Sequence, residues 1–158
     1  MPSNGCEVYA EACVVHVEYL DNYDKAWGHL ATNTIYDAGY DLRACCDTLL
    51  EPGEYALIPL GIKTSFSKGY EAQLRARSGL ALHYGVGLVN GVGTIDAGYR
   101  GEWGAVIINN GKEPFYINRG DRVCQVVFNK LPETIMVTTE LVEADSDRGG
   151  GFGSSGVK

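Results

Sequence analysis

The stretch of the sequence that is most unusual for its chemistry is residues 77–103, RSGLALHYGVGLVNGVGTIDAGYRGEW. It has polar, glycine and aromatic residues where a plain β-strand would alternate apolar and polar ones. Residues 77–79 (Arg-Ser-Gly) bring a guanidinium, a hydroxyl and backbone amides to a predicted strand-to-helix junction, and such groups can hold phosphate oxygens. Asp96 precedes a glycine turn and stands three residues before Tyr99, where a carboxylate can serve as a general base for water. The stretch therefore predicts a ligand site.

Two further features lie towards the C-terminus. Gln125 interrupts the otherwise apolar strand pattern RVCQVVF (122–128), which favours a functional role for its amide. Residues 145–158 are rich in glycine and serine around Arg148 and Phe152, and such a segment cannot pack a core by itself. It is either an unstructured terminus or a flexible lid, with one charge to reach a phosphate and one ring to stack on a base.

Other recognisable site patterns are missing from the sequence. Residues 85–90 begin like a dinucleotide fingerprint but lack its third glycine, and no G-x-x-x-x-G-K-[ST] phosphate loop occurs. The three histidines have no metal-ligand spacing, and there is no G-x-S-x-G elbow for a serine nucleophile. These observations exclude the commonest nucleotide, zinc and hydrolase motifs.

The composition indicates one globular domain in a reducing compartment. The chain has 158 residues, of which 45% are hydrophobic and 21% charged, and its formal net charge is -7, which disfavours binding to nucleic acid or to an anionic membrane. A polyanionic ligand would therefore need a local cluster of arginines. The five cysteines show no zinc spacing, and the N-terminus lacks the pattern of a signal peptide. We expect a soluble intracellular protein, cytoplasmic, or nuclear if the source is eukaryotic or viral.

The elements that must position these residues are predicted to be short strands. The 21 glycines are spread between β-branched and aromatic runs, which is typical of an all-β sandwich, jelly roll or barrel. Only residues 78–85 favour a short helix, and Asn-Gly turns at 89–93 and 109–114 predict hairpins. The predicted strands are 12–20, 54–66 with a break near Pro59, 70–77, 103–110, 114–118, 122–130 and 134–142.

Five motifs in order resemble those of the homotrimeric dUTP pyrophosphatases (dUTPases), across roughly residues 38 to 156. They are AGYDL (38–42), RSGLA (77–81), GLVN to IDAGYRG (87–101), RGDRVCQ (119–125) and RGGGFGSSG (148–156). The resemblance implies a distorted jelly-roll β-barrel over residues 1–143 and a flexible glycine-rich C-terminal lid over residues 144–158. It also implies a homotrimer with shared active sites and no direct contact with nucleic acid or membrane.

The implied reaction is hydrolysis of dUTP to dUMP and pyrophosphate, which keeps uracil out of DNA and supplies dUMP for dTMP synthesis. By resemblance, Asp96 activates the water that attacks the α-phosphorus. The implied cofactor is Mg²⁺ on the phosphates, held by Asp41 through water, since Mg²⁺ retains several waters and needs few carboxylates.

The resemblance also assigns substrate contacts. The backbone of residues 90–95 imitates a pairing adenine, with Asn90, Gly93, Thr94 and Ile95 at uracil, and Tyr99 lies against the deoxyribose and excludes a 2′-hydroxyl. Phe152 stacks on uracil when the lid closes. The phosphate contacts are Arg77, Ser78, Gly79, Gln125, Arg148, Gly153, Ser154 and Ser155.

Two departures from the family pattern concern the ends of the chain. Only three residues separate Arg148 from Phe152, one fewer than usual, so either the glycine spacer stretches or only one of the two side chains docks. Residues 21–36 match no motif and form either a surface loop or a partner site.

Two alternatives to dUTP hydrolysis are deamination of dCTP on a related fold and a non-catalytic regulatory trimer. The Ile-Asp-x-x-Tyr-Arg-Gly string argues against the first, and the presence of both Asp41 and Asp96 argues against the second.

Overall fold

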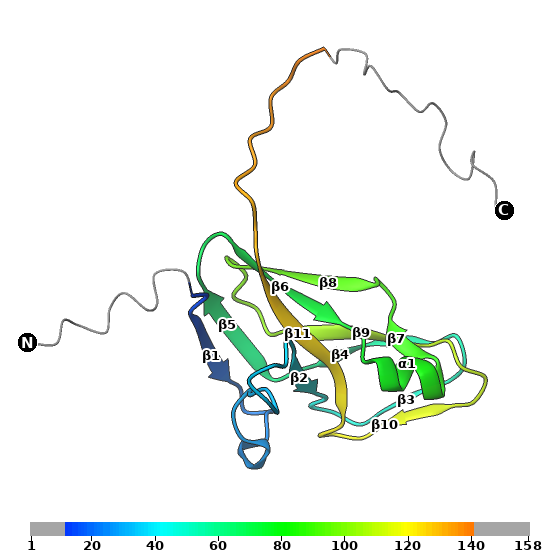
Figure 1. Ribbon diagram of the computed structural model, residues 1–158. Helices are drawn as coiled ribbons and strands as arrows, with labels where there is room; N and C mark the ends of the chain where they lie inside the picture. Colours follow the sequence, from blue (N-terminus) through cyan, green and yellow to red (C-terminus); the bar gives the residue numbers. More distant parts are fainter. Residues whose placement is uncertain (1–11, 141–158) are drawn as a thin grey trace, which may run out of the picture.

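The computed structural model describes residues 12–140, which form short strands and two small helices around one core (Figure 1). The helices are a 3-10 helix, η1 (Lys25–Trp27), and α1 (Ser78–Tyr84). The strands are β1 (Val15–Tyr19), β2 (Tyr40–Arg43), β3 (Thr48–Leu50), β4 (Tyr55–Pro59), β5 (Ile62–Phe66), β6 (Tyr70–Arg75), β7 (Val86–Leu88), β8 (Val92–Asp96), β9 (Gly104–Asn109), β10 (Phe115–Ile117) and β11 (Arg122–Lys130). The predicted all-β class is confirmed.

The strands pair antiparallel in four small sheets. The largest has the order β2-β11-β6-β8, the next has the order β4-β9-β7, and β1-β5 and β10-β3 form two-stranded ribbons. β11 is central because it pairs with β2 near its start and with β6 along the rest of its length. Hydrogen bonding does not close these sheets into one continuous barrel within residues 12–140.

The core lies between the sheets and follows the strand alternation. β5 and β9 alternate buried and half-buried residues without interruption, as strands with one face on a core must. Trp103, at the entry to β9, is the largest fully buried side chain and is 1% exposed. This periodicity explains why the sequence pattern predicted the strands that carry most of the core.

The predicted break near Pro59 is confirmed. β4 ends at Pro59 and β5 begins at Ile62, with Gly61 between them at φ +68°. A Cβ at Gly61 would also meet the sulfur of Cys45 at 2.6 Å. Both the positive φ and the close approach require glycine here.

The two predicted Asn-Gly turns exist, but the hairpin prediction is wrong for both. Gly91 has φ +71°, and β7 and β8 on either side of it pair with β9 and β6, in different sheets. The turn after β9 likewise leads into β10, which pairs with β3. Local turn chemistry was predictable, whereas the partner of each strand depends on distant residues.

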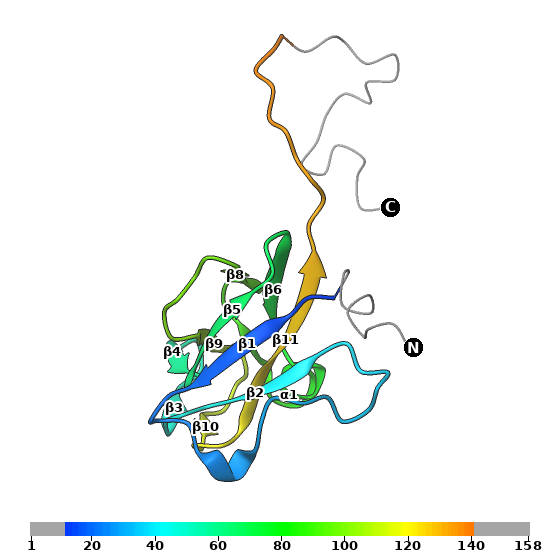
Figure 2. The ribbon, with the colours of Figure 1, turned by 90° about the vertical axis from the view of Figure 1, so that its left-hand side faces the viewer.

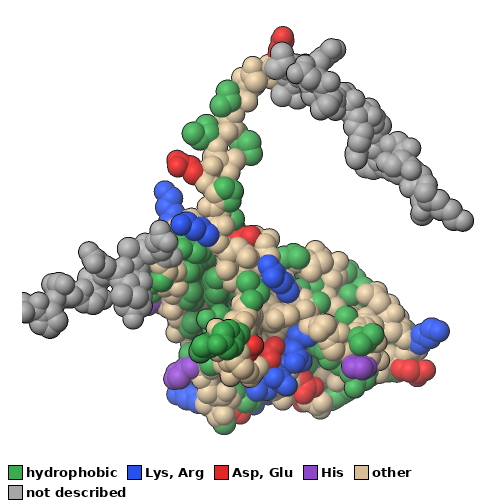
Figure 3. Space-filling view, in the orientation of Figure 1, with side chains coloured by type: hydrophobic (Ala, Val, Ile, Leu, Met, Phe, Trp, Pro, Cys, Tyr) green, Lys and Arg blue, Asp and Glu red, His purple; other side chains and the backbone are tan. Residues whose placement is uncertain are grey.

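Residues 131–140 contradict the strand predicted at 134–142 as far as they are described. After a 2.7 Å hydrogen bond from the Leu131 amide to the Gly69 oxygen, they form an extended arm outside any strand that leads away from the body (Figures 1 and 2). Ile135, Met136 and Val137 are 79%, 90% and 75% exposed, and Figure 3 shows hydrophobic side chains of this arm clear of the body. The apolar pattern is present, but among residues 12–140 it has no neighbouring strand to pair with.

The pattern also failed to predict β2, β3, β7 and β8, because strands of three to five residues give only a weak periodic signal. The predicted helix at 78–85 is confirmed as α1, which ends at Gly85 in the left-handed conformation. Neither helix within residues 12–140 has the length and apolar character needed to cross a bilayer.

Candidate active site

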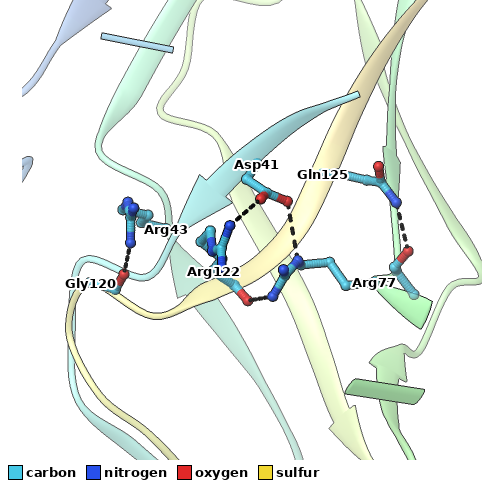
Figure 4. Close-up of polar contacts among 7 residues, drawn as sticks. Asp41, Arg43, Arg77, Gly120, Arg122 and Gln125 are labelled. Carbon is cyan, nitrogen blue, oxygen red and sulfur yellow. Dashed lines mark hydrogen bonds and ion pairs between the residues drawn. The ribbon is translucent and has the colours of Figure 1, made fainter. Parts of the chain in front are cut away.

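An arginine–aspartate cluster forms where β2, β11 and the start of α1 meet (Figure 4). The Oδ1 of Asp41 lies 3.1 Å from the Nε of Arg77, and its Oδ2 accepts a 3.0 Å hydrogen bond from Nη1 of Arg122. Nη1 of Arg77 also donates to the backbone oxygen of Arg122, at 3.0 Å. One carboxylate thus faces two guanidinium groups, which leaves a half-exposed cluster with a net positive charge that suits an anion.

Three other predicted phosphate residues lie beside this cluster. Gln125 is opposite Asp41 in the β2–β11 ladder, and its Nε2 donates to the backbone oxygen of Ala76 at 3.3 Å. A Cβ at Gly39 would overlap the side-chain oxygen of Gln125, so the glycine leaves room for the amide. Ser78 and Gly79 form the exposed first residues of α1. The structure therefore brings Asp41 and these residues together.

The predicted base and sugar residues lie on and around β8, at an edge of the four-stranded sheet. Gly93 is buried, and a Cβ there would lie 3.1 Å from the Cβ of Leu74. Thr94 and Asp96 alternate with it and are exposed, while Ile95 is half-buried. Asn90 is exposed in the turn before β8. The backbone of this strand edge, on the side away from β6, is open to a ligand.

A groove of about 670 Å³ runs along this edge. Its lining comprises residues of β4, β8, β9 and the β8–β9 turn: Leu57, Pro59, Thr94, Ile95, Asp96, Tyr99, Glu102, Trp103 and Gly104. Its volume suits a nucleoside-sized ligand. Asp96 is at the end of β8 and Tyr99 follows it in a turn closed by a 3.0 Å hydrogen bond from the Tyr99 amide to the Asp96 oxygen.

Within one chain the two groups of residues stay apart. Asp41 and Asp96 are on the two edge strands of one sheet, separated by two strands across and by about four residues along it. Strand spacing of about 4.8 Å and a rise of about 3.3 Å per residue put them about 20 Å apart. The residues predicted to bind phosphate and the residues predicted to bind the base thus form two separate groups, which we call the phosphate half-site and the base half-site.

The predicted residues of the C-terminal segment, Arg148, Phe152, Gly153, Ser154 and Ser155, lie outside the described residues.

The described residues suit a Mg²⁺ ion that is coordinated mainly by water and by the phosphates of a bound ligand. Within residues 12–140 no three His, Cys, Asp or Glu side chains gather as a metal-binding group. Asp41 offers one carboxylate that is 27% exposed, and Mg²⁺ binds through one or two carboxylates together with waters and substrate phosphates. Asp41 therefore suits contact through water, and the described residues do not suit an all-protein metal cage.

Sequence reasoning underrated Arg122 and missed Glu102. Arg122 was not among the predicted phosphate contacts, yet it shares the Asp41 carboxylate with Arg77. Its place in motif four, three residues before Gln125, was an available signal. Glu102 lines the groove and also accepts hydrogen bonds from two other segments. No local pattern could predict that, because both partners are distant in sequence.

The thiol behind the phosphate half-site is held neutral. Cys124 is fully buried on β11 next to Gln125. The pKa of Cys124 is raised to about 12, mainly by desolvation and in smaller part by the charge of Asp41, while the charge of Arg77 opposes the rise. This cysteine therefore packs as a small apolar residue and is not a nucleophile at neutral pH.

Comparisons with known proteins agree with this arrangement. The deoxyuridine 5'-triphosphate nucleotidohydrolase of Syntrophotalea carbinolica is 47% identical over 121 residues, which cover 75% of this chain and 82% of that protein. A mutant dUTPase of Staphylococcus bacteriophage 80alpha with dUpNHpp is 28% identical, with a TM-score of 0.77 and coverage of 91% of this chain and 99% of that one.

A second similar structure is that of a mutant dUTPase from phage phi11 of S. aureus, described as showing the coordination of a structural Mg(II) ion. It is 26% identical in sequence, with a TM-score of 0.73. It covers 83% of this chain and 99% of that one. The family model described as dUTPase matches residues 26–156. With all but the first 25 residues and the last two inside the match, the chain belongs to the dUTPase family.

Proposed function

We propose that this protein hydrolyses dUTP to dUMP and pyrophosphate. The observation that carries the proposal is the groove beside β8, where an exposed carboxylate, a strand edge and a tyrosine line one surface in a member of the dUTPase family. In a cell this reaction would keep uracil out of DNA and supply dUMP for dTMP synthesis.

In the proposed step, Asp96 takes a proton from a water molecule whose oxygen attacks the α-phosphorus. A bond forms between that oxygen and the α-phosphorus, while the bond from phosphorus to the bridging oxygen of the β-phosphate breaks. Pyrophosphate leaves with that electron pair. The exposure of Asp96 and its position at the end of β8 support this role, because a general base must reach the water directly.

Uracil would bind along the free edge of β8, at Asn90, Gly93, Thr94 and Ile95. Backbone amides and carbonyls there can pair with uracil, and cytosine would leave a buried donor unmatched, which enzymes exploit for strong discrimination. The ring of Tyr99 would lie against the deoxyribose. The half-exposed position of Tyr99 in the groove, at 44%, supports a contact with the ligand.

The phosphates would lie on the other half-site, against Arg77, Ser78, Gly79 and Gln125. Arg148, Phe152, Gly153, Ser154 and Ser155 would join them when the C-terminal segment 144–158 closes over the 1–143 domain. Asp41 would hold Mg²⁺ through water, and the ion when bound would neutralise charge on the phosphate chain. Arg122 would keep the Asp41 carboxylate in place.

We propose a homotrimer in which neighbouring subunits complete each other's sites. The distance of about 20 Å between the half-sites supports this arrangement, because dUTP cannot reach both within one chain. The arm of residues 131–140 supports it independently, since exposed apolar residues such as Met136 gain stability only against a partner.

Release of pyrophosphate by the purified full-length protein with Mg²⁺ tests the proposal, with dUTP, dCTP, dTTP and UTP compared in parallel. Release from dUTP alone is the expected result. Binding of dUTP without release from any of the four would overturn the hydrolase proposal.

A further inference from the structure

Residues 20–28, which include no part of the five motifs, are bonded to Glu102 in the groove and to Arg119 in the turn before β11. Asn22 makes both connections. Its Nδ2 donates a 2.7 Å hydrogen bond to Oε1 of Glu102, in the turn after Asp96. Its backbone oxygen accepts a 3.0 Å hydrogen bond from Nη2 of Arg119, in the turn before β11. We call residues 20–28 the strut.

Several contacts hold the strut against the body. The Arg119 guanidinium lies 5.0 Å from the centre of the Trp27 ring and 3.5 Å from the Asp24 carboxylate. The Tyr23 ring is buried, and its hydroxyl donates to the Gly28 oxygen at 2.8 Å. A segment with these contacts can transmit a fixed position to the groups bonded to it.

Glu102 connects the strut to Tyr99 through hydrogen bonds. Besides Asn22, Oε1 of Glu102 accepts a 3.1 Å hydrogen bond from the Gly61 amide. The backbone oxygen of Glu102 accepts a 3.1 Å hydrogen bond from the Tyr99 hydroxyl. A Cβ at Gly101 would overlap that hydroxyl. The Tyr99 ring is thus seated on the backbone of residues 101 and 102, whose position the Glu102 side chain fixes.

The direction of the Asn22 bond is determined by chemistry. A carboxylate can only accept, so the amide must present its Nδ2 to Glu102. The other amide atom, Oδ1 of Asn22, is buried without a hydrogen-bond partner in the described part of the chain. Burial of the unpaired Oδ1 of Asn22 has a cost in stability. The same orientation of the amide allows its Nδ2 to hold Glu102.

We propose that Asn22 and Glu102 are positioning residues that set the discrimination between deoxyribose and ribose through Tyr99. The inference rests on the proposed hydrolysis of dUTP. With the Asn22–Glu102 bond intact, the ring stays at a fixed distance from the sugar and leaves no space for a 2′-hydroxyl. Without that bond, the turn that carries residues 101 and 102 loosens and the ring can retreat.

The test compares kcat/KM for dUTP and UTP in the unaltered protein, in four single variants and in one double variant. Asn22→Ala, Glu102→Ala and Tyr99→Phe should each lower the dUTP-to-UTP ratio by about fivefold or more, the effect of losing one hydrogen bond. Glu102→Gln, the matched control, keeps a side-chain oxygen as acceptor and should retain the ratio within about twofold. Asn22→Ala should add nothing in the Tyr99→Phe background, since both act on one contact.

An unchanged ratio in folded Asn22→Ala and Glu102→Ala would overturn the inference while dUTP hydrolysis stands. Absence of dUTP hydrolysis in the unaltered protein would overturn the proposed function and this inference with it. If the Asn22 and Glu102 variants fail to fold, the Tyr99→Phe variant tests the inference, because it removes only the hydroxyl that bonds to Glu102. An unchanged ratio there would exclude the Tyr99 hydrogen bond as the link.

Discussion

The two aspartates singled out in the sequence have different surroundings, which suit different tasks. Asp41 is held by Arg77 and Arg122, so its charge is neutralised and its position fixed. Asp96 makes no ion pair within residues 12–140 and is exposed at the groove. A carboxylate that must move a proton needs access to water, whereas one that orients waters around an ion needs a fixed geometry.

Replacing Asp96 with asparagine should leave nucleotide binding nearly intact and lower kcat for dUTP by about 10² or more, the usual contribution of a general base. Binding of a non-hydrolysable dUTP analogue by calorimetry and pyrophosphate release would be measured on the same preparation. Turnover close to that of the unaltered protein would show that another group is the base.

Burial of two thiols makes stability depend on pH above neutrality. Desolvation raises the pKa of Cys124 to about 12 and that of Cys45 to about 11, from 9.0. The unfolded chain then loses thiol protons first, so this contribution to stability is complete below pH 9 and falls as pH rises towards 12. Urea unfolding at pH 8, 9 and 10 measures it. The decline should be shallower in Cys124→Ala, and equal slopes would contradict the assignment.

At the scale of elements, the sequence predicted the three longest strands and missed four of the shorter ones, β2, β3, β7 and β8. β9 alternates over its six residues, and β11 has nine residues with an apolar run, so both are long enough to give a sequence signal. β2 and β8, which carry Asp41 and Asp96, have only four and five residues. Their strand character comes from pairing with β11 and β6, far away in sequence.

The candidate site was predictable for a different reason. Its residues belong to short motifs whose order resembles a known family, so Arg77 and Gln125 could be assigned without the fold. The Asn22–Glu102 bond could not, because it joins residues 80 positions apart that share no motif. Spatial neighbours without a local signature are visible only in the folded chain.

Gly85 ends α1 and should be intolerant of a side chain. It has φ +71°, and a Cβ there would lie 2.8 Å from the backbone nitrogen of Gly111. Gly53 has φ +84° but nothing within 4 Å, so it is a matched control for backbone strain alone. Gly53→Ala should lower the free energy of unfolding by about 1 kcal/mol, and Gly85→Ala by clearly more. If urea unfolding gives equal losses of free energy for the two variants, the backbone at Gly111 must shift to make room for the added Cβ.

For the molecule as a whole, the described residues form a body with incomplete sites and an arm that leaves it. The body buries its own core, whereas the arm exposes Ile135, Met136 and Val137. Surfaces of this kind are stable only when covered, and in the proposed trimer the other subunits cover them.

Deleting residues 147–158 tests the proposed lid. A chain that ends at Ser146 should remain trimeric and lose most dUTP hydrolysis, because the closing contacts to uracil and phosphate are gone. Light scattering would establish the oligomeric state, and pyrophosphate release the rate. A full rate in the shortened chain would refute a catalytic role for this segment.

The division of each chain into two half-sites has a genetic consequence. A subunit with Asp96→Asn keeps its arginine cluster, and a subunit with Arg77→Ala keeps its carboxylate at the groove, so each supplies what the other lacks. If the two inactive proteins are refolded together in equal amounts, about a quarter of the sites should combine two intact halves by random assembly. Two defective alleles expressed in one cell would then complement each other.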